Sequence, residues 1–301
     1  LFDKNVKKIA RYQQFFAVKE ITKTIEKRDK NGNRKSGVIW HTQGSGKSLT
    51  MVMFSKYVLS ELKDYDPKVI VVTDRVNLDK QIYQTFNHTR LKANRATSGK
   101  HLVELINDNK ADIVTTLVHK FDIASSKQNP ILSKDIFVLV DESHRTQYGE
   151  LHIKMKQVFP NACYLAFTGT PLMKDERKNT MIKFGELIHT YTISDAVRDK
   201  TIVPLLYEGR MVDQTVNRKA IDNRLEMITR DLNDKQKEEV MTKWSQFEKI
   251  ASSDQRIGLI AFDINEHFVK NYKTKGSGFK AMLATNSRVE AIRYLKYFEE
   301  W

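Results

Sequence analysis

Five short runs of consecutive apolar residues constrain the fold of this chain more than any other feature. They are rich in branched side chains and are separated by longer segments of mixed polarity: GVIW, KVIVVT, DIVTT, IFVLVD and CYLAFTG. Apolar residues at consecutive rather than alternate positions are typical of strands that are buried on both faces. The segments between them, such as residues 49–62 and 102–106, are long enough for crossover helices. The pattern predicts an α/β fold, an open parallel sheet with helices on both faces.

The regions around these runs indicate further helices and a second lobe. Apolar residues near helical spacing predict an amphipathic helix from about residue 5 to 28. The run IVPLLYEGR predicts one more strand. We expect a first domain over residues 1–208, a highly charged helical linker over 209–253, and the beginning of a second domain over 254–301. The last domain is expected to start in helix, strand, helix order and to stop before its sheet is complete.

Composition limits the class of protein and its partners. The net charge of +14 over 301 residues makes the surface attractive to polyanions, of which nucleic acid is the commonest in a cell. A generally basic soluble protein remains the alternative. The single cysteine, Cys163, excludes a disulfide framework and favours a reducing, cytoplasmic location. No apolar stretch approaches the roughly 18 residues that span a bilayer, so we expect no membrane association.

The segment WHTQGSGKSLTM carries a phosphate-binding pattern. Gly44, Gly46, Lys47 and Ser48 follow a predicted strand and open a predicted helix. In such a loop the backbone N–H groups surround the phosphates, the lysine reaches the terminal phosphates and the serine holds Mg²⁺. The pattern predicts an ATP site in which Ser45 also lines the loop, although His41 stands where the general pattern has its first glycine. A fortuitous Gly/Ser turn is the alternative for this motif taken alone.

A pair of acidic residues supports the first interpretation. Asp141 and Glu142 end the apolar run IFVLVD. A nucleotide hydrolase needs one carboxylate to hold Mg²⁺ and another group to orient the attacking water, both at the carboxyl ends of neighbouring strands. Two adjacent acids repel each other unless a cation lies between them. An ordinary acidic surface loop is the alternative.

The motifs together resemble the superfamily 2 helicases and translocases. DESH is similar to their acidic box, HTQGSGKS to their first motif and FTGTP to the motif that links nucleotide state to the grip on nucleic acid. Within that superfamily, IWHTQGSGKSLTM, VVTDRVNLDKQ, VDESHRTQYGE, AFTGTP and VPLLYEGR are similar to the motor (restriction) subunit of type I restriction-modification enzymes. The resemblance implies RecA-like motor domains. It also implies ATP-driven translocation of double-stranded DNA and a complex with modification and specificity subunits.

The resemblance also implies residue roles. Lys47 would neutralise charge on the β and γ phosphates, Ser48 and Asp141 would hold Mg²⁺, and Glu142 would act on the hydrolytic water. RYQQFFAV is similar to an upstream motif in which a glutamine reads adenine, and the spacing to Ala17 favours Gln14 over Gln13. Residues expected to couple the ATP site to the DNA surface are His144, Thr168 and Thr170. Residues expected to contact the DNA backbone are Arg75, Thr116 and Lys120, with a solvated charge or strand-end cap as the alternative for each.

Parts of this family's machinery are expected outside this chain. No Pro-Asp pair marks the nuclease domain that precedes the motor in the family. The later motifs and the arginine finger of the second lobe are expected beyond residue 301. A strand-separating helicase outside restriction is the alternative enzyme, and a nucleotide-binding scaffold is the alternative without catalysis. The presence of Lys47, Asp141 and Glu142 argues against the scaffold.

Overall fold

Two compact units divide the chain, Leu1–Leu205 (unit 1) and Leu206–Trp301 (unit 2), and each is described by itself. A computed structural model gives the structure of the protein. The residues that it describes are 1–107, 109–122, 124, 129–141, 148–169, 181–210, 230, 233, 236–237, 254–273 and 278–300.

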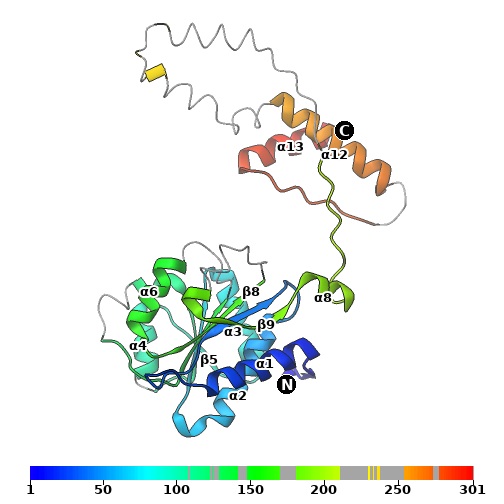
Figure 1. The fold of residues 1–301 in the computed structure, drawn as a ribbon. Helices are drawn as coiled ribbons and strands as arrows, with labels where there is room; N and C mark the ends of the chain where they lie inside the picture. The colour runs from blue at the N-terminus through cyan, green and yellow to red at the C-terminus, as the bar shows by residue number, and fades with distance from the viewer. Residues whose placement is uncertain are drawn as a thin grey trace. The chain divides into compact units, whose positions relative to one another are not determined.

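Seven parallel strands form the sheet of unit 1, in the order β5-β6-β4-β7-β8-β3-β9 (Figure 1). Their bounds are Gly37–His41 (β3), Lys68–Thr73 (β4), Ala93–Arg95 (β5), Ile113–Leu117 (β6), Ile136–Asp141 (β7), Cys163–Thr168 (β8) and Glu186–Tyr191 (β9). Five of these strands are the five apolar runs, so the predicted open parallel sheet is confirmed. The sequence pattern does not predict β5 and β9, because these edge strands are only partly buried and carry no continuous apolar run.

Helices cover both faces of the sheet, as predicted. One face packs against α1 (Tyr12–Glu26), α2 (Lys47–Glu61) and α3 (Val76–His88). The other packs against α4 (Gly99–Asn107) and α6 (Tyr148–Val158). Side chains of β4 alternate between the two cores, with Val69 and Val71 in the first and Ile70 and Val72 in the second. This alternation explains why an unbroken apolar run is required in a strand that is buried on both faces.

The segments before and after the sheet differ from the expectation. A hairpin of β1 (Phe2–Asp3) and β2 (Val6–Lys7) precedes α1, so the helix predicted from residue 5 begins at Tyr12. The two turn residues, Lys4 and Asn5, have φ of 48° and 67°, which an α-helix does not allow. Short elements complete unit 1: the 3₁₀ turns η1 (Lys63–Tyr65) and η2 (Val118–Lys120), and the helix α8 (Ile193–Arg198).

The strand predicted in IVPLLYEGR is wrong. Residues 203–210 have no ladder partner, and Val203, Leu205 and Tyr207 are 84%, 90% and 92% exposed. An apolar segment becomes a strand only where a neighbouring strand can pair with its backbone N–H and C=O groups. The predicted linker over 209–253 lies mostly outside the described residues and stays a prediction.

Unit 2 contains two described helices, α12 (Asp254–Asn271) and α13 (Arg288–Glu300). They pack through a small core of Ile257, Ala261 and Tyr294. The expected strand between them is absent from the described residues, since 278–285 form no ladder. No helix in the described part of the chain is long and apolar enough to cross a membrane.

Candidate nucleotide-binding site

The loop between β3 and α2 has the backbone geometry of a phosphate cradle. Gly44 and Gly46 have φ of 81° and 89°, a left-handed conformation that glycine adopts without strain. Gly46 is the N-cap of α2, so the positive end of the helix dipole faces the loop. The hydroxyl of Ser45 is buried and has no hydrogen-bond partner within the described part of the chain. This donor set fits an anionic phosphate.

Lys47 lies between the ends of two strands. Its Nζ donates to the carbonyl oxygen of His41 at 3.3 Å. A Cβ on Gly169, just after β8, would lie 2.7 Å from the same Nζ, so the absence of a side chain there leaves room for the ammonium. Ser48 follows in the first turn of α2 and is half-buried. The sequence therefore places the lysine and the serine on the side of the helix start where phosphates would bind.

The carboxyl ends of β7 and β8 reach the same edge of the sheet. Asp141 ends β7 and is 8% exposed, and Thr168 ends β8 and is fully buried. β8 lies between β7 and β3, with Asp141 opposite Phe167 and Trp40 opposite Thr168. Because parallel strands end at one edge, the topology brings the predicted acid and the predicted loop together. The predicted sites Glu142, His144 and Thr170 lie outside the described residues.

The side-chain amide of Gln14 links the start of α1 to the loop. Its Oε1 accepts from the backbone N–H of Arg11 at 3.0 Å, and its Nε2 donates to the carbonyl oxygen of Gly46 at 3.1 Å. A primary amide carries two donors and two acceptor lone pairs, so one of each is left. That remaining pair is what recognition of adenine requires. Gln13 is also buried, and its Nε2 has no partner in the described part of the chain, so neither glutamine is eliminated.

The predicted DNA contacts lie in three different environments. The Arg75 side chain is 59% exposed, beside Asp74 at 3.6 Å. Lys120 is half-buried and donates to the carbonyl oxygen of Ala96, and burial lowers the pKa of its ammonium. Thr116 is fully buried within β6, so the structure contradicts it as a surface contact. β6 continues to Leu117, and every residue of this strand is buried, including Thr116.

Comparison with known proteins identifies the family of this chain. The pattern of the SWI2/SNF2 ATPase family matches residues 13–238. The chain belongs to the SWI2/SNF2 ATPase family. A putative type I restriction enzyme MjaIXP endonuclease subunit of Methanocaldococcus jannaschii is 35% identical over 80% of this chain and 24% of its own length. The type I restriction enzyme HindI endonuclease subunit of Haemophilus influenzae is 34% identical over 68% of this chain and 21% of its own length.

The chain therefore spans about a quarter of the length of these relatives. Among solved structures, a nuclease-deletion mutant of the Type ISP restriction-modification enzyme LlaGI in complex with a DNA substrate mimic is 15% identical. The match covers 98% of the present chain and 30% of the LlaGI chain, with a TM-score of 0.49.

One residue of this SWI2/SNF2 ATPase departs from the general loop pattern. His41 replaces the usual first glycine, is fully buried and places Nε2 2.8 Å from Nδ1 of His189. Burial, then the neighbouring His189 and Lys47, lower the pKa of His41 to about 3, so the ring is neutral at physiological pH. Burial also lowers the pKa of His189. His41 is therefore a neutral, buried ring at the start of the loop. The sequence gives no indication that it meets His189, because β9, the strand that carries His189, was not predicted.

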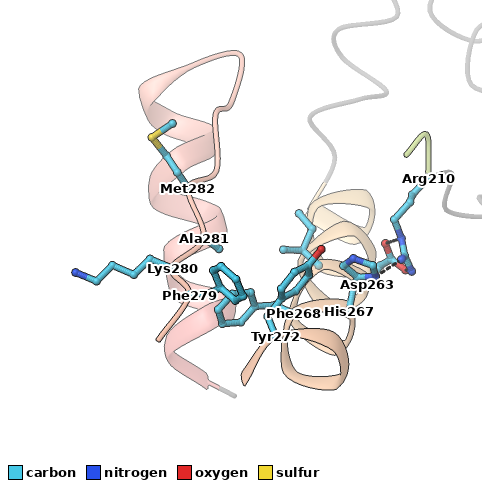
Figure 2. A pocket seen from close by; sticks show the side chains of 10 residues that line it. Arg210, Asp263, His267, Phe268, Tyr272, Phe279, Lys280, Ala281 and Met282 are labelled. Carbon is cyan, nitrogen blue, oxygen red and sulfur yellow. Dashed lines mark hydrogen bonds and ion pairs between the residues drawn. The ribbon is translucent and has the colours of Figure 1, made fainter. Parts of the chain in front are cut away.

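Unit 2 of this SWI2/SNF2 ATPase contains a separate cavity of about 400 Å³ (Figure 2). Arg210 forms a bidentate ion pair with Asp263, at 2.9 and 2.7 Å, on one side. Aromatic rings line the other, where Phe279 meets Tyr272 edge-on at 5.8 Å. Met282 is 95% exposed at its rim. None of the residues predicted to bind ATP lines this cavity.

Proposed function

We propose that this chain is the nucleotide-binding part of an ATP-driven motor that translocates double-stranded DNA within a type I restriction enzyme. The loop at Gly44–Lys47, at the same sheet edge as Asp141, carries the nucleotide part of the proposal. Similarity to the endonuclease subunits of type I restriction enzymes supports the restriction context. On this proposal the partners are double-stranded DNA and the modification and specificity subunits.

We assign each residue a role within this proposal. The N–H groups of the loop and the ammonium of Lys47 bind the β and γ phosphates. Ser48 and Asp141 hold Mg²⁺, which when bound neutralises phosphate charge. Glu142 orients the hydrolytic water and accepts its proton. Gln14 reads adenine with the donor and acceptor that its bonds to Gly46 and Arg11 leave free.

The domain arrangement follows the same proposal. Residues 1–208 are the first RecA-like motor domain, 209–253 a helical linker and 254–301 the beginning of the second RecA-like domain. Thr168, with His144 and Thr170, couples the nucleotide to DNA. Of the predicted DNA contacts, Arg75 and Lys120 remain in the proposal.

Nucleotide binding tests the proposal first. A ligand that binds only the folded state stabilises it by about 2.7 kcal/mol at a concentration 100 times its dissociation constant. Mg-ATP is expected to raise the melting temperature of the wild-type chain, and Lys47→Ala is expected to abolish the shift. Lys56→Ala, an exposed lysine on the same helix, is the matched control and should keep it. An equal shift in both variants would place nucleotide elsewhere and overturn the proposal.

Translocation and strand separation are distinguished by a second assay. A protein extended to the length of the relatives is expected to displace a triplex-forming strand from duplex DNA when ATP is present. It should leave the duplex strands paired. Strand separation without triplex displacement would favour the alternative, a superfamily 2 helicase outside restriction.

A further inference from the structure

The segment that leaves unit 1 passes close to the nucleotide loop. After α8, the chain turns back so that Cγ2 of Ile202 lies 3.3 Å from the position that a Cβ on Gly44 would take. Gly44 has no side chain and a positive φ, so the side chain of Ile202 lies beside the loop at the place that a larger residue would crowd. From Val203 onward the side chains are exposed, at 84% for Val203 and 90% for Leu205. Ile202 thus precedes the exposed segment that continues into unit 2.

Hydrogen bonds hold residues 201 and 202 in place just before the exposed segment begins. The N–H groups of Thr201 and Ile202 donate to the carbonyl oxygen of Ala196 at 2.8 and 3.3 Å. The hydroxyl of Thr201 lies 3.2 Å from that of Tyr191 and accepts from Arg11 Nη1 at 3.4 Å. These bonds hold the backbone of Ile202 at a defined position beside the loop.

Asp199 connects the same segment to the elements that hold the loop. Its carboxylate accepts from the hydroxyl of Tyr191 at 2.9 Å and from the hydroxyl of Tyr12. The backbone carbonyl of Tyr191 accepts from the N–H of Thr42, the first loop residue, at 2.9 Å. The bond to Asp199 raises the pKa of Tyr12 to about 12 and lowers that of the carboxyl, so both groups keep the protonation states that the bond needs.

Two routes therefore lead from the loop to the segment at 199–202. One is the close approach of Ile202 to Gly44, and the other runs from Thr42 through Tyr191 to Asp199. A ligand changes the conformation of a segment only when its binding free energy differs between the conformations of that segment. Phosphate in the loop meets this condition if the loop binds it more tightly when Ile202 is in place.

We propose that Ile202 is a positioning residue that transmits nucleotide occupancy of the loop to the connecting segment at 203–207. Phosphate bound by the loop N–H groups fixes Gly44, and the fixed glycine holds Ile202 and the residues after it. Coupling of this kind is reciprocal, so a change in the connecting segment also changes nucleotide affinity. The inference rests on the proposed function in one respect, that nucleotide binds at this loop.

Proteolysis of the connecting segment tests the proposal in the whole 301-residue chain. Chymotrypsin cleaves after leucine and tyrosine, and Leu205, Leu206 and Tyr207 are at least 90% exposed. Cleavage requires several residues on each side to detach locally, so a held Ile202 slows it. Saturating Mg-ADP, verified by calorimetry, is expected to slow cleavage at 205–207 several-fold in the wild type. In Ile202→Ala the chain still binds Mg-ADP, but Mg-ADP is expected to slow cleavage much less than in the wild type, because only the route through Asp199 remains.

Val203→Ala is the matched control, because it truncates a neighbouring β-branched side chain that is exposed. It should keep the full nucleotide response. Asp199→Ala removes the second route and should reduce the response without abolishing it. Retention of the full response in Ile202→Ala, or no response in a wild-type chain that binds Mg-ADP, would overturn the proposal.

Hydrogen exchange without nucleotide separates this proposal from the proposed function. The amides of residues 44–46 are expected to exchange several-fold faster in Ile202→Ala than in Val203→Ala, since the loop has lost its contact. Equal exchange in the two variants would overturn the role of Ile202. A wild-type chain that binds no nucleotide contradicts the proposed function instead, and the exchange experiment still decides whether Ile202 positions the loop.

Discussion

The described parts of unit 1 and unit 2 differ in the apolar core that they contain. Unit 1 has a seven-stranded sheet with a buried apolar cluster on each face. The described core of unit 2 is three residues between two helices, and Phe279 and Met282 are 65% and 95% exposed. Precise placement of polar groups needs a rigid support. The comparison favours the sheet edge of unit 1 as the place of the proposed nucleotide site.

The largest expected effect is a loss of ATP turnover. It tests whether hydrolysis depends on unit 1 and not on unit 2. Glu142→Gln, in a protein extended to the length of the relatives, is expected to keep ATP binding and lose hydrolysis by orders of magnitude, because an amide cannot accept the proton of water. Glu299→Gln, the same change at an exposed position of unit 2, should leave the rate within a few-fold. Steady-state phosphate release measures both. Near-normal turnover in Glu142→Gln would break the assignment to unit 1.

Core truncation sharpens the contrast in stability. Phe137 of β7 is fully buried against Phe54, at 5.9 Å between ring centroids, and Phe137→Ala is expected to cost about 3–5 kcal/mol of unfolding free energy. Tyr294→Ala should cost less and should accelerate hydrogen exchange in α12 and α13 while leaving β4 protected. Urea titration with peptide-resolved hydrogen exchange reports both effects. Equal losses in the two units would show that unit 2 has a core as large as that of unit 1.

Acid should destabilise unit 1 through its buried histidines. Burial lowers the pKa of His152 to about 4 and that of His41 to about 3, below the unfolded value near 6.5. The unfolded chain then binds more protons, so the stabilisation is complete above about pH 6.5 and is lost as pH falls toward the folded values. Each group contributes at most about 1.4 kcal/mol per pH unit in that window. His152→Leu should flatten the decline between pH 6.5 and 4 in urea titrations, and an unchanged decline would contradict this role for His152.

DNA binding is the smallest expected effect of a single substitution. If Arg75 contacts a phosphate, Arg75→Ala should reduce the slope of log affinity against log salt by about 0.9. Arg288→Ala, an exposed arginine of unit 2, is the matched control. Fluorescence anisotropy with duplex DNA at several salt concentrations measures both slopes. An equal change of slope in the two variants would mean that DNA responds to the basic charge of the whole surface and not to Arg75 in particular.

The sheet and the loop were predicted from local sequence patterns. The errors occur where the structure of a segment depends on elements that are distant in the sequence. GSGKS after GVIW predicts its own turn and helix, because glycine conformations and helix starts depend on adjacent residues. The strand expected at IVPLLYEGR lacks a partner, and β9 is a strand because β3 offers one. Thr116 shows the same limit, since its exposure depends on the helices packed over β6. Interpretation of the residues that the structure does not describe, Glu142 among them, rests on the sequence alone.

The sequence by itself determined the parallel sheet, the glycine-containing loop between β3 and α2, and the acid at the end of β7. These features depend on residue type and on spacing along one stretch of chain. Only the tertiary structure decided that His41 meets His189, that Gln14 is attached to Gly46, and that Ile202 lies against Gly44. Each of these pairs is far apart in sequence, and the members come together only because strand order places β9 beside β3 and α1 beside the loop. Such contacts leave no periodic trace in a single sequence, because the packing of the sheet and helices determines which side chains meet.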